Sequence, residues 1–206
     1  MPKIKLLLAT GNPHKAEEMR AILVNAPISL ELVSLTEAAR GREVLEPQEN
    51  GKNYFENALL KAKAVAKLTD LPIIADDSGL EIEALDNEPG LHSARYAESL
   101  GGHANAIQEI LKRLKDKDNR KARFVCDIVL INDGDKPLLF EGVANGEIAE
   151  APKGEGGFGY DPVFHSYEVN KMFSELTQEE KNKVSHRGKA LYKLLTYLRI
   201  AHQSIK

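Results

Sequence analysis

An apolar run in residues 71–80 stops at two adjacent carboxylates, and this pattern constrains the fold more than any other segment. Residues 73–75 read Ile-Ile-Ala, as in a buried strand, and Asp76 and Asp77 follow directly. The two aspartates would point to opposite faces of a continuing strand, whereas Ser78-Gly79 predicts a turn. In α/β proteins the carboxyl ends of strands open onto the ligand site, and paired aspartates there commonly hold a hard cation such as Mg²⁺. The alternative is a strand end with two solvated aspartates.

Hydrophobic periodicity predicts strands and helices that alternate in the first half of the chain, before a strand-rich middle. Strands are expected at residues 3–9, 30–34, 73–75, 122–132, 137–143 and 146–151. Helices are expected at residues 15–24, 54–68, 105–114, from 177 onward and at about 187–201. Residues 36–52 are expected to form an exposed loop, and residues 79–102 to be mostly irregular. The order predicts an α/β fold with a mixed β-sheet flanked by helices, and no composition break divides residues 1–206 into separable domains.

Three short signals predict where elements begin or turn. Asn53 can cap the helix that starts at residue 54, and Thr177 with Glu180 forms a capping box. Asp133-Gly134-Asp135 predicts the turn of a hairpin between two strands.

The composition excludes several classes of protein. A formal net charge of -3 argues against a surface that coats nucleic acid. The one cysteine, Cys126, lies in an apolar run, so no disulfide framework is expected and a reducing compartment fits. No stretch has the length of a transmembrane helix, and the first residues lack the apolar core of a signal peptide. We expect a cytoplasmic protein without a membrane partner.

Residues 9–15 predict a strand-to-helix turn that binds phosphate groups. Backbone N–H groups and the positive end of the helix dipole favour an anion at such a turn. Thr10, Asn12 and Lys15 add hydroxyl, amide and ammonium groups, with Lys15 as the point charge for a polyphosphate. The second glycine and the Lys-Ser/Thr pair of a Walker motif are missing. An ordinary capped helix start is the alternative.

Three glutamates could complete a metal site at Asp77. Mg²⁺ takes carboxylates, waters and phosphate oxygens, so Glu46, Glu49 or Glu56 could supply a further ligand. Lys61 lies one helical face away from these glutamates and could bind a phosphate group. The alternative for these side chains is that they are solvated on an exposed face.

Two further segments are candidates for binding a nucleoside. Residues 154–162 contain four glycines within six positions, and Phe158 and Tyr160 offer flat faces on which a base could stack. Residues 181–188 gather basic side chains near a helix start, where the macrodipole disfavours cations unless an anionic or carbonyl-bearing ligand lies nearby. A flexible hairpin tip and a solvated basic face are the respective alternatives.

Six motifs in this order resemble those of the inosine triphosphate pyrophosphatases, also called non-canonical purine NTP pyrophosphatases or dITP/XTP diphosphatases. The motifs are Thr10-Gly11-Asn12-Pro13-His14-Lys15, Phe55-Glu56-Asn57-Ala58-Leu59-Leu60-Lys61-Ala62, Ala75-Asp76-Asp77-Ser78-Gly79-Leu80, Pro89-Gly90-Leu91-His92-Ser93-Ala94-Arg95-Tyr96, Gly157-Phe158-Gly159-Tyr160-Asp161-Pro162 and Ser185-His186-Arg187. They span nearly the whole chain, and their common order and spacing make the resemblance specific.

The resemblance implies an elongated mixed α/β fold with two lobes around a nucleotide cleft, usually as a homodimer. It implies Mg²⁺-dependent hydrolysis of ITP, dITP and XTP to the monophosphate and pyrophosphate. The expected partner is therefore a purine nucleoside triphosphate rather than a nucleic acid polymer.

The resemblance also implies a role for each matching residue. Asp77 corresponds to the proton acceptor and, with Glu49, to the metal ligands. The residues that would bind the substrate are Thr10, Gly11, Asn12, Pro13, His14, Lys15, Lys61, Ser78, Phe158, Gly159, Tyr160, Asp161, Lys181, His186 and Arg187. Two departures are local: Asn53-Tyr54 stands where a Thr-Phe pair is common, and Gln48 precedes Glu49 where another acid is frequent. Glu46 is therefore the alternative loop ligand.

The chemistry of the residues leaves two questions open. A water near the α-phosphorus would lose its proton to Asp77 or to its neighbour Asp76. No residue stands out as a nucleophile for a covalent intermediate, so direct attack by water is preferred. A related pyrophosphatase for modified pyrimidine or methylated nucleotides, or a non-catalytic nucleotide sensor, could use the same pocket.

Overall fold

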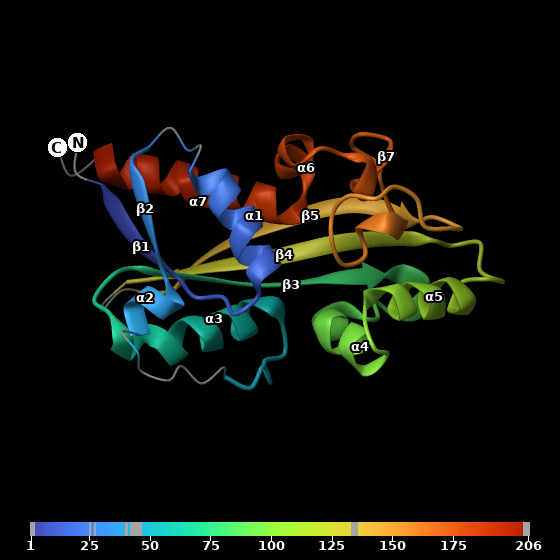
Figure 1. The fold of residues 1–206 in the computed structure, drawn as a ribbon, viewed down its shortest axis with the longest axis horizontal. Coiled ribbons are helices and arrows are strands. Elements are labelled where there is room, and N and C mark those ends of the chain that lie inside the picture. The colour runs from blue at the N-terminus through green and yellow to red at the C-terminus, as the bar shows by residue number, and fades with distance from the viewer. Residues whose placement is uncertain are drawn as a thin grey trace. The chain divides into compact units, whose positions relative to one another are not determined.

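A mixed sheet flanked by helices is the main feature of the fold, which confirms the predicted fold class. The computed structural model describes residues 3–24, 26, 28–39, 41, 47–132 and 136–203. Within these residues seven strands form one sheet with the order β2-β1-β3-β4-β5-β6-β7 (Figure 1). The strands are β1 (Ile4–Leu8), β2 (Leu30–Ser34), β3 (Ile73–Ile82), β4 (Lys121–Ile131), β5 (Leu138–Ile148), β6 (Phe164–Ser166) and β7 (Lys171–Met172).

The helices vary greatly in length. They are α1 (Pro13–Val24), α2 (Leu35–Ala39), α3 (Tyr54–Val65), α4 (Ser93–Ser99), α5 (His103–Arg113), α6 (Gln178–Val184) and α7 (His186–Gln203), with short 3₁₀ turns between several of them. No helix in the described part of the chain is both long and apolar enough to cross a membrane.

Contacts along the backbone divide the chain into two compact units. The first unit comprises residues 1–77, 126–141 and 190–206, and the second comprises residues 78–125 and 142–189. The division falls within β3, β4 and β5, so each of these strands contributes residues to both units. The two units are described separately below.

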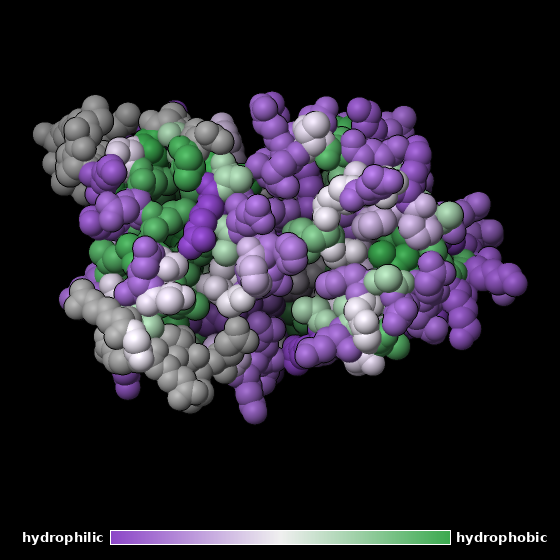
Figure 2. All heavy atoms as spheres, viewed as in Figure 1, coloured by the Kyte–Doolittle hydropathy of each residue, from purple (hydrophilic) through white to green (hydrophobic). Residues whose placement is uncertain are grey.

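The first unit is built on parallel strands covered on both faces. β1 pairs in parallel with β2 and β3, with Leu7 opposite Ile73 in the second pair. Leu6 and Leu8 pack with residues of α1 and α7, whereas Leu7 packs on the other face against α3 (Figure 1). This double cover explains why β1 ends in three consecutive buried leucines, because a parallel strand buried on both faces needs no polar alternation. β2 is half-buried at the sheet edge, and apolar residues show over this part of the molecule in Figure 2.

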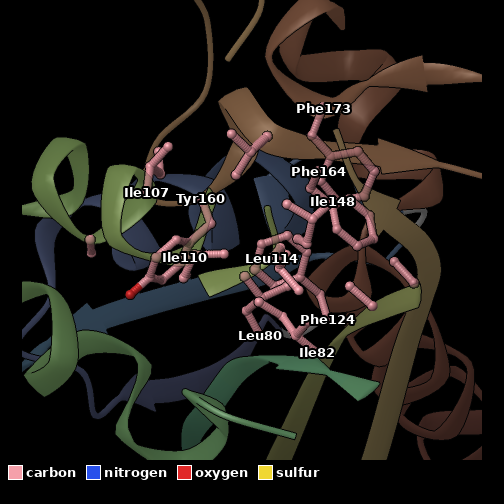
Figure 3. Close-up of a cluster of buried hydrophobic side chains, with 14 of the residues drawn as sticks. Leu80, Ile82, Ile107, Ile110, Leu114, Phe124, Ile148, Tyr160, Phe164 and Phe173 are labelled. Carbon is pink, nitrogen blue, oxygen red and sulfur yellow. The ribbon is translucent and has the colours of Figure 1, made fainter. Parts of the chain in front are cut away.

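The second unit has a core rich in aromatic side chains. The ring centroids of Phe124, Phe164 and Phe173 are 4.7–5.9 Å apart. Figure 3 labels these three residues within the cluster. Ile107 and Ile110 of α5 lie in the same cluster. β5 pairs antiparallel with β6, and β6 with β7. This antiparallel edge differs from the parallel strands of the first unit and makes the sheet mixed.

The predicted turn at Ser78-Gly79 is wrong, because β3 continues through these residues to Ile82. Leu80 and Ile82 are fully buried in the core of the second unit, so burial beyond the aspartates favours a continued strand. The sequence pattern could not show this, because that core is formed mainly by residues much later in the chain.

Three other predictions about local structure need correction. The expected loop at residues 36–52 begins with the helix α2, and residues 79–102 contain α4 rather than being mostly irregular. The two strands expected at residues 137–143 and 146–151 are one strand, β5. The hairpin turn predicted at Asp133-Gly134-Asp135 lies outside the described residues.

Both predicted helix caps are confirmed. The Asn53 side chain accepts a hydrogen bond from the backbone N–H of Glu56 at 2.8 Å, at the start of α3. Thr177 and Glu180 form the reciprocal capping box that opens α6. These are local interactions, which is why the sequence alone identified them.

Candidate active site

The residues expected to bind the nucleotide fall into two groups, one in each unit. In the first unit, the phosphate-binding turn follows β1 and leads directly into α1. The Asn12 carboxamide oxygen accepts a hydrogen bond from the backbone N–H of Lys15 at 3.1 Å, and Pro13 occupies the first helical position. Gly11 and His14 are exposed on the same turn. No acidic residue occupies the first turn of α1, so the positive end of its dipole suits an anion.

Lys15 forms an ion pair with Asp76. Its ammonium lies 3.2 Å from a carboxylate oxygen of Asp76, whose side chain is fully buried, whereas the Lys15 side chain is 15% exposed. The pair fixes the lysine at the turn that begins α1. Asp76 is thereby assigned to charge balance on this face of β3.

Asp77 lies on the opposite face of β3, as the alternation of a strand requires. One carboxylate oxygen accepts a hydrogen bond from the Asn57 carboxamide and the other from the Lys61 ammonium, each at 3.0 Å. Lys61 also lies 3.0 Å from Glu49, so one ammonium group joins the two carboxylates expected to hold a metal. Burial lowers the pKa of Lys61, but Asp77, Asp76 and Glu49 together raise it above its ordinary value. The surrounding carboxylates therefore favour the charged form of Lys61 at the centre of the cluster.

The loop that carries Glu49 is fixed to the start of α3. The backbone N–H of Gly51 donates to the Asn57 carboxamide oxygen at 2.8 Å, and that of Lys52 donates to Glu56 at 2.7 Å. Glu56 thus has a structural contact in the loop, while Glu49 points to Lys61. Glu46, the alternative metal ligand, lies outside the described residues.

The donor set fits a hard divalent cation that binds together with phosphate. The described residues contain no group of three or more His, Cys, Asp or Glu that could form a protein cage for a metal. Mg²⁺ is usually held by only one or two carboxylates plus substrate phosphates and water. Glu49 and Asp77, which share one ammonium partner, offer such a pair.

Sequence reasoning missed two buried polar residues of this cluster, Asn57 and Asp127. Asp127 lies on β4, and burial, followed by the charges of Glu141 and Asp77, raises its pKa to about 6. A hydrogen bond from the backbone N–H of Phe55 lowers the pKa of Asp127 and partly offsets this rise. Asn57 belongs to a motif quoted for its resemblance, and Asp127 is a carboxylate within an apolar strand. In both cases a polar residue at an apolar position of its segment was the signal that could have identified it.

In the second unit, the glycine-rich loop folds around a buried ion pair. Asp161 and Lys181 lie 2.6 Å apart with side chains only 3% and 4% exposed. Asp161 also accepts the backbone N–H of Phe158 at 2.8 Å. Gly157 has φ +76°, and a Cβ there would collide with the Asp161 carboxylate. The sequence needs glycine at this position for both conformation and space.

Two cations lie over the Phe158 ring. The Lys181 ammonium is 4.8 Å and the Arg187 guanidinium carbon 5.9 Å from the ring centroid. Arg187 is 2% exposed and donates to the Ser78 hydroxyl at 3.0 Å. His186 is buried with its ring stacked on Phe124 at 4.7 Å. The structure therefore brings Phe158, Lys181 and Arg187 together, whereas His186 stacks on the aromatic core.

Two expectations about this group change. Lys181 lies in the last turn of α6, where the helix dipole favours a cation, whereas His186 and Arg187 begin α7, near a helix start as expected. Tyr160 is 3% exposed, its hydroxyl donates to the Ser93 carbonyl at 2.8 Å, and its ring meets His103 edge-on. Its ring is therefore part of the core, which leaves the half-buried Phe158 as the aromatic face of the loop.

Known proteins resemble this chain in sequence over most of its length. Residues 6–197 match the model of the Ham1 family. The chain is 48% identical over 198 residues to the dITP/XTP pyrophosphatase of Thermus thermophilus, covering 93% of this chain and 90% of the relative. It is 40% identical over 199 residues to the dITP/XTP pyrophosphatase of Treponema denticola, covering 95% and 99%.

Solved structures agree with this relationship. A HAM1 protein from Coxiella burnetii superposes with a TM-score of 0.84 at 41% identity, covering 95% of this chain and 98% of that one. The Staphylococcus aureus Ham1 protein gives a TM-score of 0.81 at 35% identity, again covering 95% and 98%. This chain belongs to the Ham1 family.

Proposed function

We propose that this protein hydrolyses non-canonical purine nucleoside triphosphates, namely ITP, dITP and XTP, to the monophosphate and pyrophosphate. The observation that carries the proposal is the cluster in which Lys61 lies 3.0 Å from both Asp77 and Glu49. Such a cluster combines acceptors for a cation with a positive charge for phosphate. Similarity to proteins named dITP/XTP pyrophosphatase over more than nine-tenths of the chain supports the substrate class.

Glu49 and Asp77 would hold Mg²⁺, which when bound supplies charge neutralisation at the phosphate oxygens. The six residues of the turn would bind the triphosphate: Thr10, Gly11, Asn12, Pro13, His14 and Lys15. Lys61 and Ser78 would assist them. Lys15 and the N-terminus of α1 would stabilise the negative charge that builds up on the departing pyrophosphate.

Asp77 is the better candidate for accepting the proton of the attacking water. Asp76 is fully buried against Lys15, so protonating it would remove the charge that balances this lysine. Asp77 is bonded to Lys61, whose ammonium can transfer its contact to a phosphate oxygen when substrate binds. Its carboxylate then has capacity for the water that attacks the α-phosphorus.

The second unit would recognise the base. Phe158 would stack on the purine, and Lys181, His186 and Arg187 would offer donors to its 6-carbonyl group. Adenine places an amino group there, so a donor would face a donor at a cost of roughly 1–3 kcal/mol per group. Gly159, Tyr160 and Asp161 would shape the loop that positions Phe158.

A homodimer in the cytoplasm completes the proposal. The dimer follows from the resemblance, and the location from the single buried cysteine, Cys126.

Pyrophosphate release, measured over common and deaminated purine and pyrimidine triphosphates with and without Mg²⁺, tests the function. We expect efficient release from ITP, dITP and XTP only with the cation. Equal release from ATP and ITP would indicate a general nucleotide pyrophosphatase, and preference for modified pyrimidine nucleotides would indicate a different substrate class. Binding without any release would indicate a sensor.

A further inference from the structure

We propose that Asn57 is a positioning residue of the reaction, because its carboxamide joins Asp77 to the backbone of the loop that carries Glu49. The inference rests on the proposed function and deepens it. In the proposed function Asn57 has no assigned contact with the purine base or with the phosphate groups.

Both ends of the Asn57 carboxamide are used. Its nitrogen donates to Asp77 at 3.0 Å, and its oxygen accepts the backbone N–H of Gly51 at 2.8 Å. The residue is fully buried. It lies on α3, one turn after the cap made by Asn53. The amide is therefore held by a helix.

This arrangement orients the Asp77 carboxylate. Asn57 occupies one oxygen, so the other faces Lys61, which in turn reaches Glu49. The Lys61 contacts are ion pairs that a divalent cation or a phosphate can replace. The Asn57 contact involves a neutral amide, which can remain in place when charges rearrange. Asn57 would thus hold Asp77 and the loop that carries Glu49 at a fixed position relative to each other as substrate binds.

The close approach of the loop is confirmed by Gly51. A Cβ at this position would lie 2.6 Å from the Asn57 carboxamide oxygen and 2.7 Å from the Glu56 Cβ. Both distances are below any normal contact, so a side chain at residue 51 would displace the amide. The loop backbone is therefore packed directly on Asn57.

The chemistry of the two contacts requires an amide. One end must donate to a carboxylate and the other must accept an N–H group, and an uncharged carboxamide does both. An aspartate could still accept from Gly51 but would place a second carboxylate against Asp77. The two tasks can therefore be separated by substitution.

The test uses Asn57→Asp and Asn57→Ala in the full chain, with Asn53→Ala as the matched control. Asn53 caps the same helix and is exposed, so its loss weakens α3 without touching Asp77. Three quantities are measured: kcat and KM for dITP with Mg²⁺, the thermal midpoint, and hydrogen exchange of the Gly51 amide in metal-free protein.

We expect both Asn57 variants to lose about 100-fold in kcat with a smaller change in KM, because misplacing a reacting group by about 1 Å costs this much. Exchange at Gly51 should accelerate in Asn57→Ala but stay slow in Asn57→Asp. Asn53→Ala should lower the thermal midpoint while kcat stays within about twofold of the unmodified protein, since the cap stabilises the start of α3 and does not contact Asp77.

Folded Asn57 variants with kcat within about twofold of the unmodified protein would overturn the inference. An equal loss of kcat in Asn53→Ala would also do so, because it would assign the effect to helix stability. Where an Asn57 variant does not fold, Gly51→Ala replaces it and should lower kcat in the same direction. If the unmodified protein releases no pyrophosphate from dITP, the proposed function fails. The Gly51 exchange pattern then decides whether Asn57 anchors the loop, and unchanged exchange in Asn57→Ala would reject that as well.

Discussion

The candidate sites of the two units differ in how their charged side chains are paired. At the site of the first unit two lysines are paired with carboxylates: Lys15 with Asp76, and Lys61 with Asp77 and Glu49. In the second unit two cations lie over an aromatic ring, Phe158, and Asp161 is the carboxylate paired with one of them.

The difference indicates what kind of group each site suits. A balanced cluster of carboxylates and ammonium groups can exchange partners with a cation and phosphates at little electrostatic cost. A half-buried ring with donors around it suits a flat ligand that carries carbonyl acceptors. We therefore assign the chemistry to the first unit and the choice of base to the second, and the following predictions probe that division.

The largest effect is expected from Asp77→Asn. An amide can neither take the water's proton nor balance a cation, so kcat for ITP should fall by about 10²–10⁴-fold while the nucleotide still binds. Steady-state hydrolysis and a binding titration measure the two effects. Asp70→Asn, at an exposed position, is the control. Near-normal turnover by Asp77→Asn would remove the chemistry from this residue.

Lys15→Ala should weaken binding of ITP by about tenfold or more and binding of IMP much less. Lys15 is assigned to the departing pyrophosphate, which the monophosphate lacks. Dissociation constants for both ligands, with the exposed Arg20→Ala of the same helix as control, check this. Equal losses for ITP and IMP would place Lys15 at the α-phosphate or in a purely structural role.

Arg187→Ala should change the choice of base more than the chemistry. We expect the ratio of kcat/KM for ITP over ATP to fall by about tenfold, as one donor to the 6-carbonyl group is lost. Lys183→Ala, on the exposed side of α6, should leave the ratio unchanged. A uniform loss on both nucleotides would contradict the assignment of selectivity to the second unit.

Asp127 should make stability depend on pH in one direction. Its pKa is raised from 3.8 to about 6 by burial and by Glu141 and Asp77, so the folded state holds this proton more tightly than the unfolded chain. The free energy of unfolding should therefore fall as pH rises from about 4 to 6, with the full penalty present above pH 6. In metal-free buffer at pH 8, Asp127→Asn should be more stable by about 1–3 kcal/mol.

Denaturant unfolding at pH 4 and pH 8 measures this effect, and the exposed Asp116→Asn should show no change. A variant that is less stable at pH 8 would show that the Asp127 carboxylate contributes more through Phe55 than it loses by burial.

The features that the sequence predicted correctly, such as helix caps and strand alternation, depend on neighbouring residues. Asn53 and Thr177 cap helices through contacts three residues away, and the strand alternation at Asp76 and Asp77 separates their side chains onto opposite faces. Each of these features depends on one segment only. Local chemistry was therefore sufficient for them.

The features that the sequence did not predict depend on distant residues. Ser78-Gly79 continues as strand because Leu80 and Ile82 are buried in a core formed largely by residues after 100. The Arg187 contact with Ser78 spans 109 positions. Asn57 and Asp127 gained significance only when the fold placed them near Asp77. A single sequence without its fold could not show these contacts.

The central claim is that the first unit directs water to the α-phosphorus. Hydrolysis of dITP in ¹⁸O-labelled water with Mg²⁺, followed by mass spectrometry of both products, tests it most directly. The proposed mechanism predicts one labelled oxygen in dIMP and none in pyrophosphate. Label in pyrophosphate, or release of inorganic phosphate from the γ-position, would contradict it.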